Sequence, residues 1–169
     1  MWQDGQDHAK AGSPPVVELS RCPAAENCTD SSSWTIMGRA DDKNATGCAA
    51  SACYALFPRV EGGAPDQIGV MWMDDRLGAP LDHTNGWNVW YRTSTRGGLD
   101  WKGPSVRVSQ YDPSRTESKP NGFLFPYGDY EGIDLRDGGT HAVMIWGEGH
   151  NYTGGPDAPG HVVYRTIAT

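Results

Sequence analysis

The sequence lacks the patterns that mark membrane spans and surface helices. No apolar run approaches the roughly 18 residues that a membrane-spanning helix needs. No window of about 11 residues repeats apolar side chains at helical spacing without an intervening Gly or Pro. We therefore expect no membrane span and almost no helix.

Positive charge is also scarce. Lys and Arg number 14 against 21 Asp and Glu, so the formal net charge is −7. Nucleic acids and anionic membranes attract proteins through clusters of basic side chains. The acidic balance therefore argues against both partners and leaves neutral sugars or cationic partners open.

Turn-forming and aromatic residues are abundant instead. The chain contains 22 Gly and 12 Pro, with 7 Trp and 7 Tyr to fill a core. Short β-branched or aromatic runs are bounded by Gly, Pro, Asp and Asn, which is typical of strands. The expected strands span residues 16–21, 34–40, 57–60, 68–74, 87–95, 105–109, 130–135, 141–146 and 161–168. The expected fold class is all-β, after a polar lead-in at residues 1–15.

A repeat with a period of 73 residues connects these strands. Residues 89–93 (VWYRT) recur as residues 162–166 (VVYRT), and residues 70–71 recur as residues 143–144. The same offset pairs Val16 with Val89, Phe57 with Tyr130, Val60 with Ile133 and Asp75 with Glu148. Four antiparallel strands repeated at a fixed period are the plan of a β-propeller blade. We expect a complete blade at 57–109 and partial blades at 16–40 and 130–169.

The number of repeats does not complete a ring. The chain holds about 2.3 repeats, whereas propellers need roughly four to eight blades. Strands near Val16 and His161 would then be free edges, which recruit further strands. We expect the chain to pair with itself or to dock onto the remainder of a longer protein.

The four cysteines form two close pairs, Cys22 with Cys28 and Cys48 with Cys53. The spacing suits two local disulfides better than the shorter pairs typical of zinc sites, although free buried thiols stay open. Disulfides indicate a secreted or extracytoplasmic protein. The first residues show no basic, apolar leader, so we expect a mature form or a piece of a longer chain.

One segment resembles the Asp-box of sialidase-type propellers, S-x-D-x-G-x-T-W. In residues 94–101 (STRGGLDW), Ser94, Gly98 and Trp101 match, whereas Arg96 and Asp100 replace the usual Asp and Thr. Together with residues 70–76, 127–133 and 161–166, the segment resembles the C-terminal half of bacterial secreted sialidase-like propeller proteins. The box is a folding motif, so we expect Trp101 to be buried beneath its turn. We expect Trp34 to be buried likewise beneath the Cys22–Cys28 loop.

The resemblance implies a site on one face of a six-bladed ring, formed by the loops between second and third strands and those entering each blade. Tyr130 would attack or orient, Glu131 or Glu148 would act as base, and Asp75 would be the acid. Arg76 would bind an anionic group. The other expected substrate-binding residues are Asp82, His83, Tyr127, Asp129, His150 and Tyr152.

Simpler interpretations stay open. Asp75 and the preceding Asp74 could cap loop amides, and Tyr130 could pack inside an inner strand. The stretch at 82–87 lacks the arginine that sialidases place there. We therefore expect a secreted, glycan-directed hydrolase of sialidase-like type without cofactor or metal, or a non-catalytic propeller module that binds glycan or protein.

Overall fold

The computed structural model describes residues 2–5, 14–42, 53–77, 87–109, 131–148 and 161–169. In these residues all regular structure is β-strand apart from two short 3-10 turns, η1 (Ser31–Ser33) and η3 (Asp137–Gly139). No helix in the described ranges is long and apolar enough to cross a membrane.

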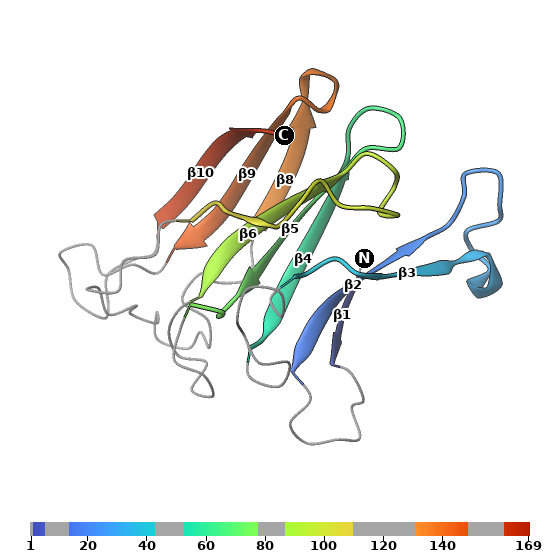
Figure 1. Cartoon of the computed structure of the whole chain (residues 1–169), viewed down its shortest axis with the longest axis horizontal. Coiled ribbons are helices and arrows are strands. Elements are labelled where there is room, and N and C mark those ends of the chain that lie inside the picture. Colours follow the sequence, from blue (N-terminus) through green and yellow to red (C-terminus); the bar gives the residue numbers. More distant parts are fainter. Residues whose placement is uncertain (1, 6–13, 43–52, 78–86, 110–130, 149–160) are drawn as a thin grey trace.

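The strands form three antiparallel sheets (Figure 1). The N-terminal sheet contains β1 (Trp2–Gly5), β2 (Pro15–Arg21) and β3 (Thr35–Arg39). The middle sheet contains β4 (Ala55–Gly62), β5 (Ile68–Asp74), β6 (Asn88–Ser94) and β7 (Val106–Arg107). The C-terminal sheet contains β8 (Glu131–Arg136), β9 (His141–Glu148) and β10 (His161–Ala168). The all-β expectation is confirmed.

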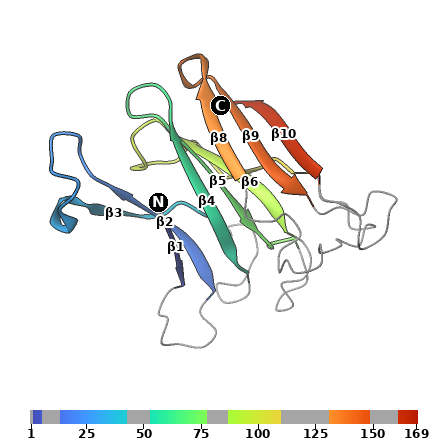
Figure 2. The ribbon, with the colours of Figure 1, turned by 180° about the vertical axis from the view of Figure 1, so that it is seen from behind.

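The middle sheet lies between the other two, as Figures 1 and 2 both show. Residues 70–73 of β5 are all fully buried because both faces of this sheet are covered. Val70 and Trp72 pack with Val17 and Leu19 of the N-terminal sheet.

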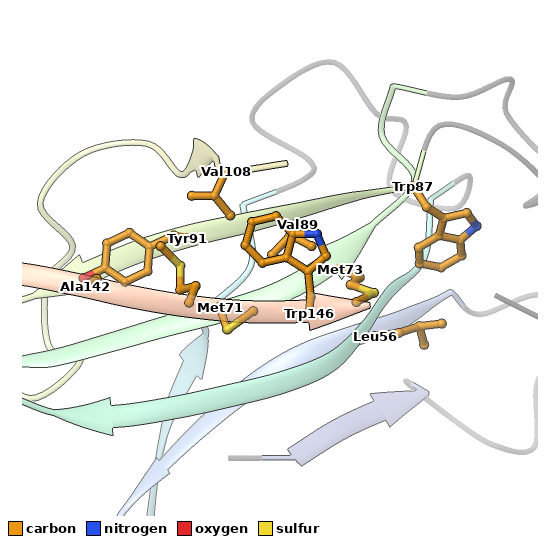
Figure 3. Packing of buried hydrophobic residues seen from close by; sticks show 10 residues of the cluster. Leu56, Met71, Met73, Trp87, Val89, Tyr91, Val108, Ala142 and Trp146 are labelled. Carbon is orange, nitrogen blue, oxygen red and sulfur yellow. The ribbon is translucent and has the colours of Figure 1, made fainter. Parts of the chain in front are cut away.

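The opposite face of the middle sheet meets the C-terminal sheet (Figure 3). Met71, Met73 and Tyr91 pack here with Met144 and Trp146 of β9. Burying side chains of this size stabilises the fold by about 1.5–3 kcal/mol each. The two apolar clusters therefore hold the three sheets in one stack.

One end of the stack is where β5 and β9 finish and β4, β6, β8 and β10 begin. We call this end the rim. At the other end, Gln67 Nε2 of the β4–β5 turn donates a hydrogen bond to the Gly139 carbonyl at 2.7 Å. Gly139 has φ +86°, and a Cβ there would overlap the Gln67 side chain. The turn between β8 and β9 therefore needs glycine at position 139, both for the positive φ and for the close approach of the Gln67 side chain.

Two expectations about the strands and turns need correction. Residues 2–5, expected in a polar lead-in, form β1 and pair with β2. Trp34 is 45 % exposed and only touches the disulfide loop, donating from Nε1 to the Cys28 carbonyl at 3.0 Å. It lies just before β3, which is an edge strand among the described residues.

Residues 94–101 form a turn between β6 and β7, and Trp101 is less buried than expected. Ser94 Oγ accepts hydrogen bonds from the amides of Arg96 and Gly98. Trp101 is only partly buried; it packs against the cluster between the N-terminal and middle sheets, and the Arg92 guanidinium lies 4.9 Å from its ring.

The Cys22–Cys28 disulfide is confirmed. Cys53 is also disulfide-bonded, and its expected partner, Cys48, lies outside the described residues.

Candidate functional site

A buried ion pair lies at the rim, where β5 ends. Asp74 is the last residue of β5, and Arg76 follows it after one residue. Their side chains are 0 % and 1 % exposed, and Arg76 Nη2 lies 2.5 Å from Asp74 Oδ2. Trp72 Nε1 also donates to Asp74 Oδ2, at 2.8 Å. The short spacing keeps both charges inside the end of a single strand.

Arg76 also connects two neighbouring sheets. Its Nη2 lies 3.0 Å from Asp42 Oδ1, and Asp42 follows β3 of the N-terminal sheet. Its Nη1 donates to Ser105 Oγ at 3.1 Å, and its guanidinium carbon lies 3.8 Å from the centroid of the Trp90 ring. Arg76 is therefore a buried cross-link between the sheets.

This geometry opposes the expected role of Arg76 in binding an anionic ligand. The guanidinium already contacts the carboxylates of Asp42 and Asp74, so an anion would have to displace one of them. It is also shielded from solvent. A buried, doubly paired guanidinium serves the fold.

The two carboxylates around Arg76 differ in their protonation behaviour. Burial raises the pKa of Asp74 and outweighs the hydrogen bonds and charge of Arg76. Burial also opposes the ionised form of Asp42. There, however, hydrogen bonds from Ser105 and the charge of Arg76 prevail, and the pKa of Asp42 lies below its ordinary value.

Asp75, the expected acid, caps a neighbouring strand. It is 4 % exposed, and its Oδ1 accepts a hydrogen bond from the Tyr54 amide at 2.7 Å, just before β4. Asp41 accepts from the Val17 amide of β2 at 2.8 Å in the same manner. The capping interpretation of Asp75 therefore has direct support.

A serine side chain caps a third strand in the same way. Ser109, two residues after β7, accepts from the Val89 amide of β6 at 2.8 Å. Side-chain oxygens thus take the place of a neighbouring carbonyl at three strand ends of the rim.

Two expected carboxylates lie on adjacent strands of the C-terminal sheet. Glu131 begins β8 opposite Trp146, and Glu148 ends β9 opposite His161. Their backbones are diagonal neighbours, a separation of about 7–8 Å. The rim therefore brings these two expected residues together. The remaining expected residues are outside the described part of the chain: Asp82, His83, Tyr127, Asp129, Tyr130, His150 and Tyr152.

The sequence interpretation missed Asp41, Asp42 and Ser105. A signal was available, because Asp41-Asp42 follows one strand as Asp74-Asp75 follows another. Among the described residues, no group of three or more His, Cys, Asp or Glu side chains is arranged to hold a metal ion.

Comparison with protein-family models, with curated proteins and with solved structures gives no match to the chain.

Proposed function

We propose that the three sheets are blades of a β-propeller, with one complete blade and two partial ones. A repeated contact between successive sheets supports this. Arg92 Nη1 of the middle sheet donates to the Ala40 carbonyl of the preceding sheet. Arg165 Nη1 of the C-terminal sheet donates to the Val108 carbonyl of the middle sheet. The two arginines are 73 positions apart, which is the period of the sequence repeat.

Strand register supports the same proposal and refines the period. Val60 lies opposite Val70 in the middle sheet, and Ile133 lies opposite Met144 in the C-terminal sheet. Val60 and Ile133 are 73 positions apart, whereas Val70 and Met144 are 74 apart. On this alignment Glu148 corresponds to Asp74, one residue before the Asp75 that the sequence match chose.

We infer that the rim binds carbohydrate. The observation that carries this inference is the common end of the three stacked sheets. At the rim, β5 ends and β6 begins, β7 ends and β8 begins, and β9 ends and β10 begins. The sequence between these strand ends, residues 78–86, 110–130 and 149–160, contains the expected Asp, His and Tyr residues, whose carboxylates and aromatic rings suit sugar hydroxyls and sugar faces. The disulfide-bonded cysteines favour an extracytoplasmic location.

Binding without catalysis is the function that the geometry favours. Asp75, the expected acid, caps a strand, and Arg76, expected to bind an anionic group, belongs to a buried ion pair. One observation keeps hydrolysis as a second candidate. Glu131 and Glu148 are diagonal neighbours on adjacent strands at the rim, and glycosidases act through two carboxyl groups about 5–10 Å apart.

The first experiment measures binding. The labelled protein is applied to an array of sialylated and neutral oligosaccharides, and hits are repeated by isothermal titration. We expect saturable binding to at least one class. The absence of binding to every glycan would overturn the carbohydrate proposal.

The second experiment separates binding from hydrolysis. Turnover of a fluorogenic α-sialoside and of neutral glycosides is measured for the wild type, Glu131→Gln and Glu148→Gln. Glu61→Gln is the matched control, because Glu61 is exposed on β4 away from the rim. Activity that either rim substitution lowers about 100-fold or more would establish hydrolysis. Binding of glycan without turnover would establish a non-catalytic carbohydrate-binding module.

A further inference from the structure

The outward face of the C-terminal sheet exposes an apolar surface. Val162 and Tyr164 of β10 are 76 % and 75 % exposed, and Ile145 of β9 is 46 % exposed. Ile145 lies opposite Tyr164 in the strand register, so the three side chains share one face. We call Ile145, Val162 and Tyr164 the outer patch.

The middle sheet has an equivalent pair of residues on a face that another sheet covers. There Met71 lies opposite Tyr91, as Ile145 lies opposite Tyr164. Met71 and Tyr91 are 0 % and 3 % exposed, because the C-terminal sheet packs on them (Figure 3). The outer patch therefore repeats the pattern of a sheet face that receives another sheet.

We propose that a second copy of this chain covers the outer patch, with the two C-terminal sheets packed face to face about a two-fold axis. Charge favours this occupant. Asp134 and Arg136 lie on the same face and pair with each other at 2.6 Å, so the face is locally neutral in a chain of net charge −7. Two copies can therefore approach through this face without the repulsion that other surfaces would produce.

Head-to-tail stacking is the less favourable arrangement. Val17 and Leu19 of β2 face the middle sheet, so the intervening Glu18, which lies opposite Arg39, faces away from it. The far side of the N-terminal sheet exposes Ile36, but it also carries these two charged positions, which the outer patch would have to cover. Packing like against like removes more apolar surface from water.

The area of the face sets the expected strength. Three strands of six to eight residues cover about 350–400 Å² at ordinary strand spacing and rise. Stable interfaces bury about 800 Å² per partner. The face is about half as large, so we expect a weak, reversible dimer that forms only at high protein concentration. The proposal does not depend on carbohydrate binding.

Sedimentation velocity at concentrations from about 1 to 500 µM tests the proposal, because a weak dimer forms only toward the upper end of such a range. The wild type should pass from its 18.3 kDa monomer to a dimer as concentration rises. Val162→Thr combined with Tyr164→Thr should weaken the dimer at least about 10-fold while retaining strand-forming side chains. Ile36→Thr is the matched control, because Ile36 is 66 % exposed on a different sheet. It should leave the dimer unchanged.

Hydrogen exchange on the wild type makes the test independent of variant folding. Amides of β9 and β10 should exchange more slowly at the high concentration than at the low one, whereas those of β2 and β3 should not change. A wild type that stays monomeric at every concentration would overturn the proposal. If that monomer binds an apolar dye at the outer patch, the patch is exposed and another protein is its occupant. A dimer that persists in the folded Val162/Tyr164 variant would do the same.

Discussion

Replacement of Arg76 by Met tests whether the buried ion pair maintains the fold. The substitution leaves Asp42 and Asp74, whose side chains are 7 % and 0 % exposed, without their counter-ion. Removing one partner of a buried ion pair costs about 3–5 kcal/mol. Loss of the guanidinium from the face of Trp90 adds up to about 2 kcal/mol, part of which the apolar Met side chain recovers. We expect the free energy of unfolding to fall by about 4 kcal/mol.

Urea denaturation and calorimetry measure this loss. Since domains of this size are stable by about 5–15 kcal/mol, the variant should stay folded but melt about 8–16 °C lower. Adding Asp74→Asn should restore part of the loss, because the second change removes a charge that the first left unpaired. Arg136→Met is the control; its pair with Asp134 is exposed, and its loss should cost less than about 1 kcal/mol.

Two results would refute this reasoning. One is an Arg76→Met protein within about 1 kcal/mol of the wild type, since a buried pair cannot be broken so cheaply. The other is normal stability together with lost ligand binding, which would restore the anion-binding role expected from the sequence.

Three further predictions concern the disulfide, a turn and acid stability. A proteolytic fragment containing Cys22 and Cys28 should be lighter by two hydrogen atoms before reduction, and Cys22→Ser with Cys28→Ser should cost about 2–3 kcal/mol in unfolding experiments. Gly139→Ala should destabilise by about 1–3 kcal/mol because its φ of +86° strains a residue with a Cβ, and the Gln67 side chain would also have to move, whereas Gly62→Ala, with nothing within 4 Å, should be nearly neutral. The lowered pKa of Asp42 means that its stabilising contribution is present above about pH 4 and disappears as the pH falls through the folded-state value. Asp42→Asn should therefore flatten the loss of stability below about pH 4; an unchanged acid profile would contradict this.

Strand positions were largely predictable from the sequence. The bounds of β5 and β10 match the expected ranges 68–74 and 161–168, because alternating or continuous apolar runs there end at turn residues. The strand β1 was missed, since its four residues, WQDG, carry no apolar alternation. Its place depends on pairing with β2 and not on its own propensity.

Residue roles at the rim were less predictable. The sequence shows Arg76 as a cation after a strand, but its partner Asp42 lies 34 positions earlier and in another sheet. Only the stacking of the sheets brings the two together. The offset between the repeats was also not fully predictable. Paired residues of the β8–β9 hairpin are one position further apart in the sequence than those of the β4–β5 hairpin, and a match of two adjacent residues does not reveal this difference.

The strand caps at Asp41, Asp75 and Ser109 have a consequence for how the chain can vary. Each cap completes the hydrogen bonding of a neighbouring strand immediately before the chain enters a connection that joins two strands. A change of length or composition in residues 43–52, 78–86 or 110–130 therefore leaves the pairing of the strands unaltered, because the side-chain cap before each of these segments holds the strand end in place. The rim can therefore accept altered connections, natural or engineered, while the sheets that carry them keep their pairing.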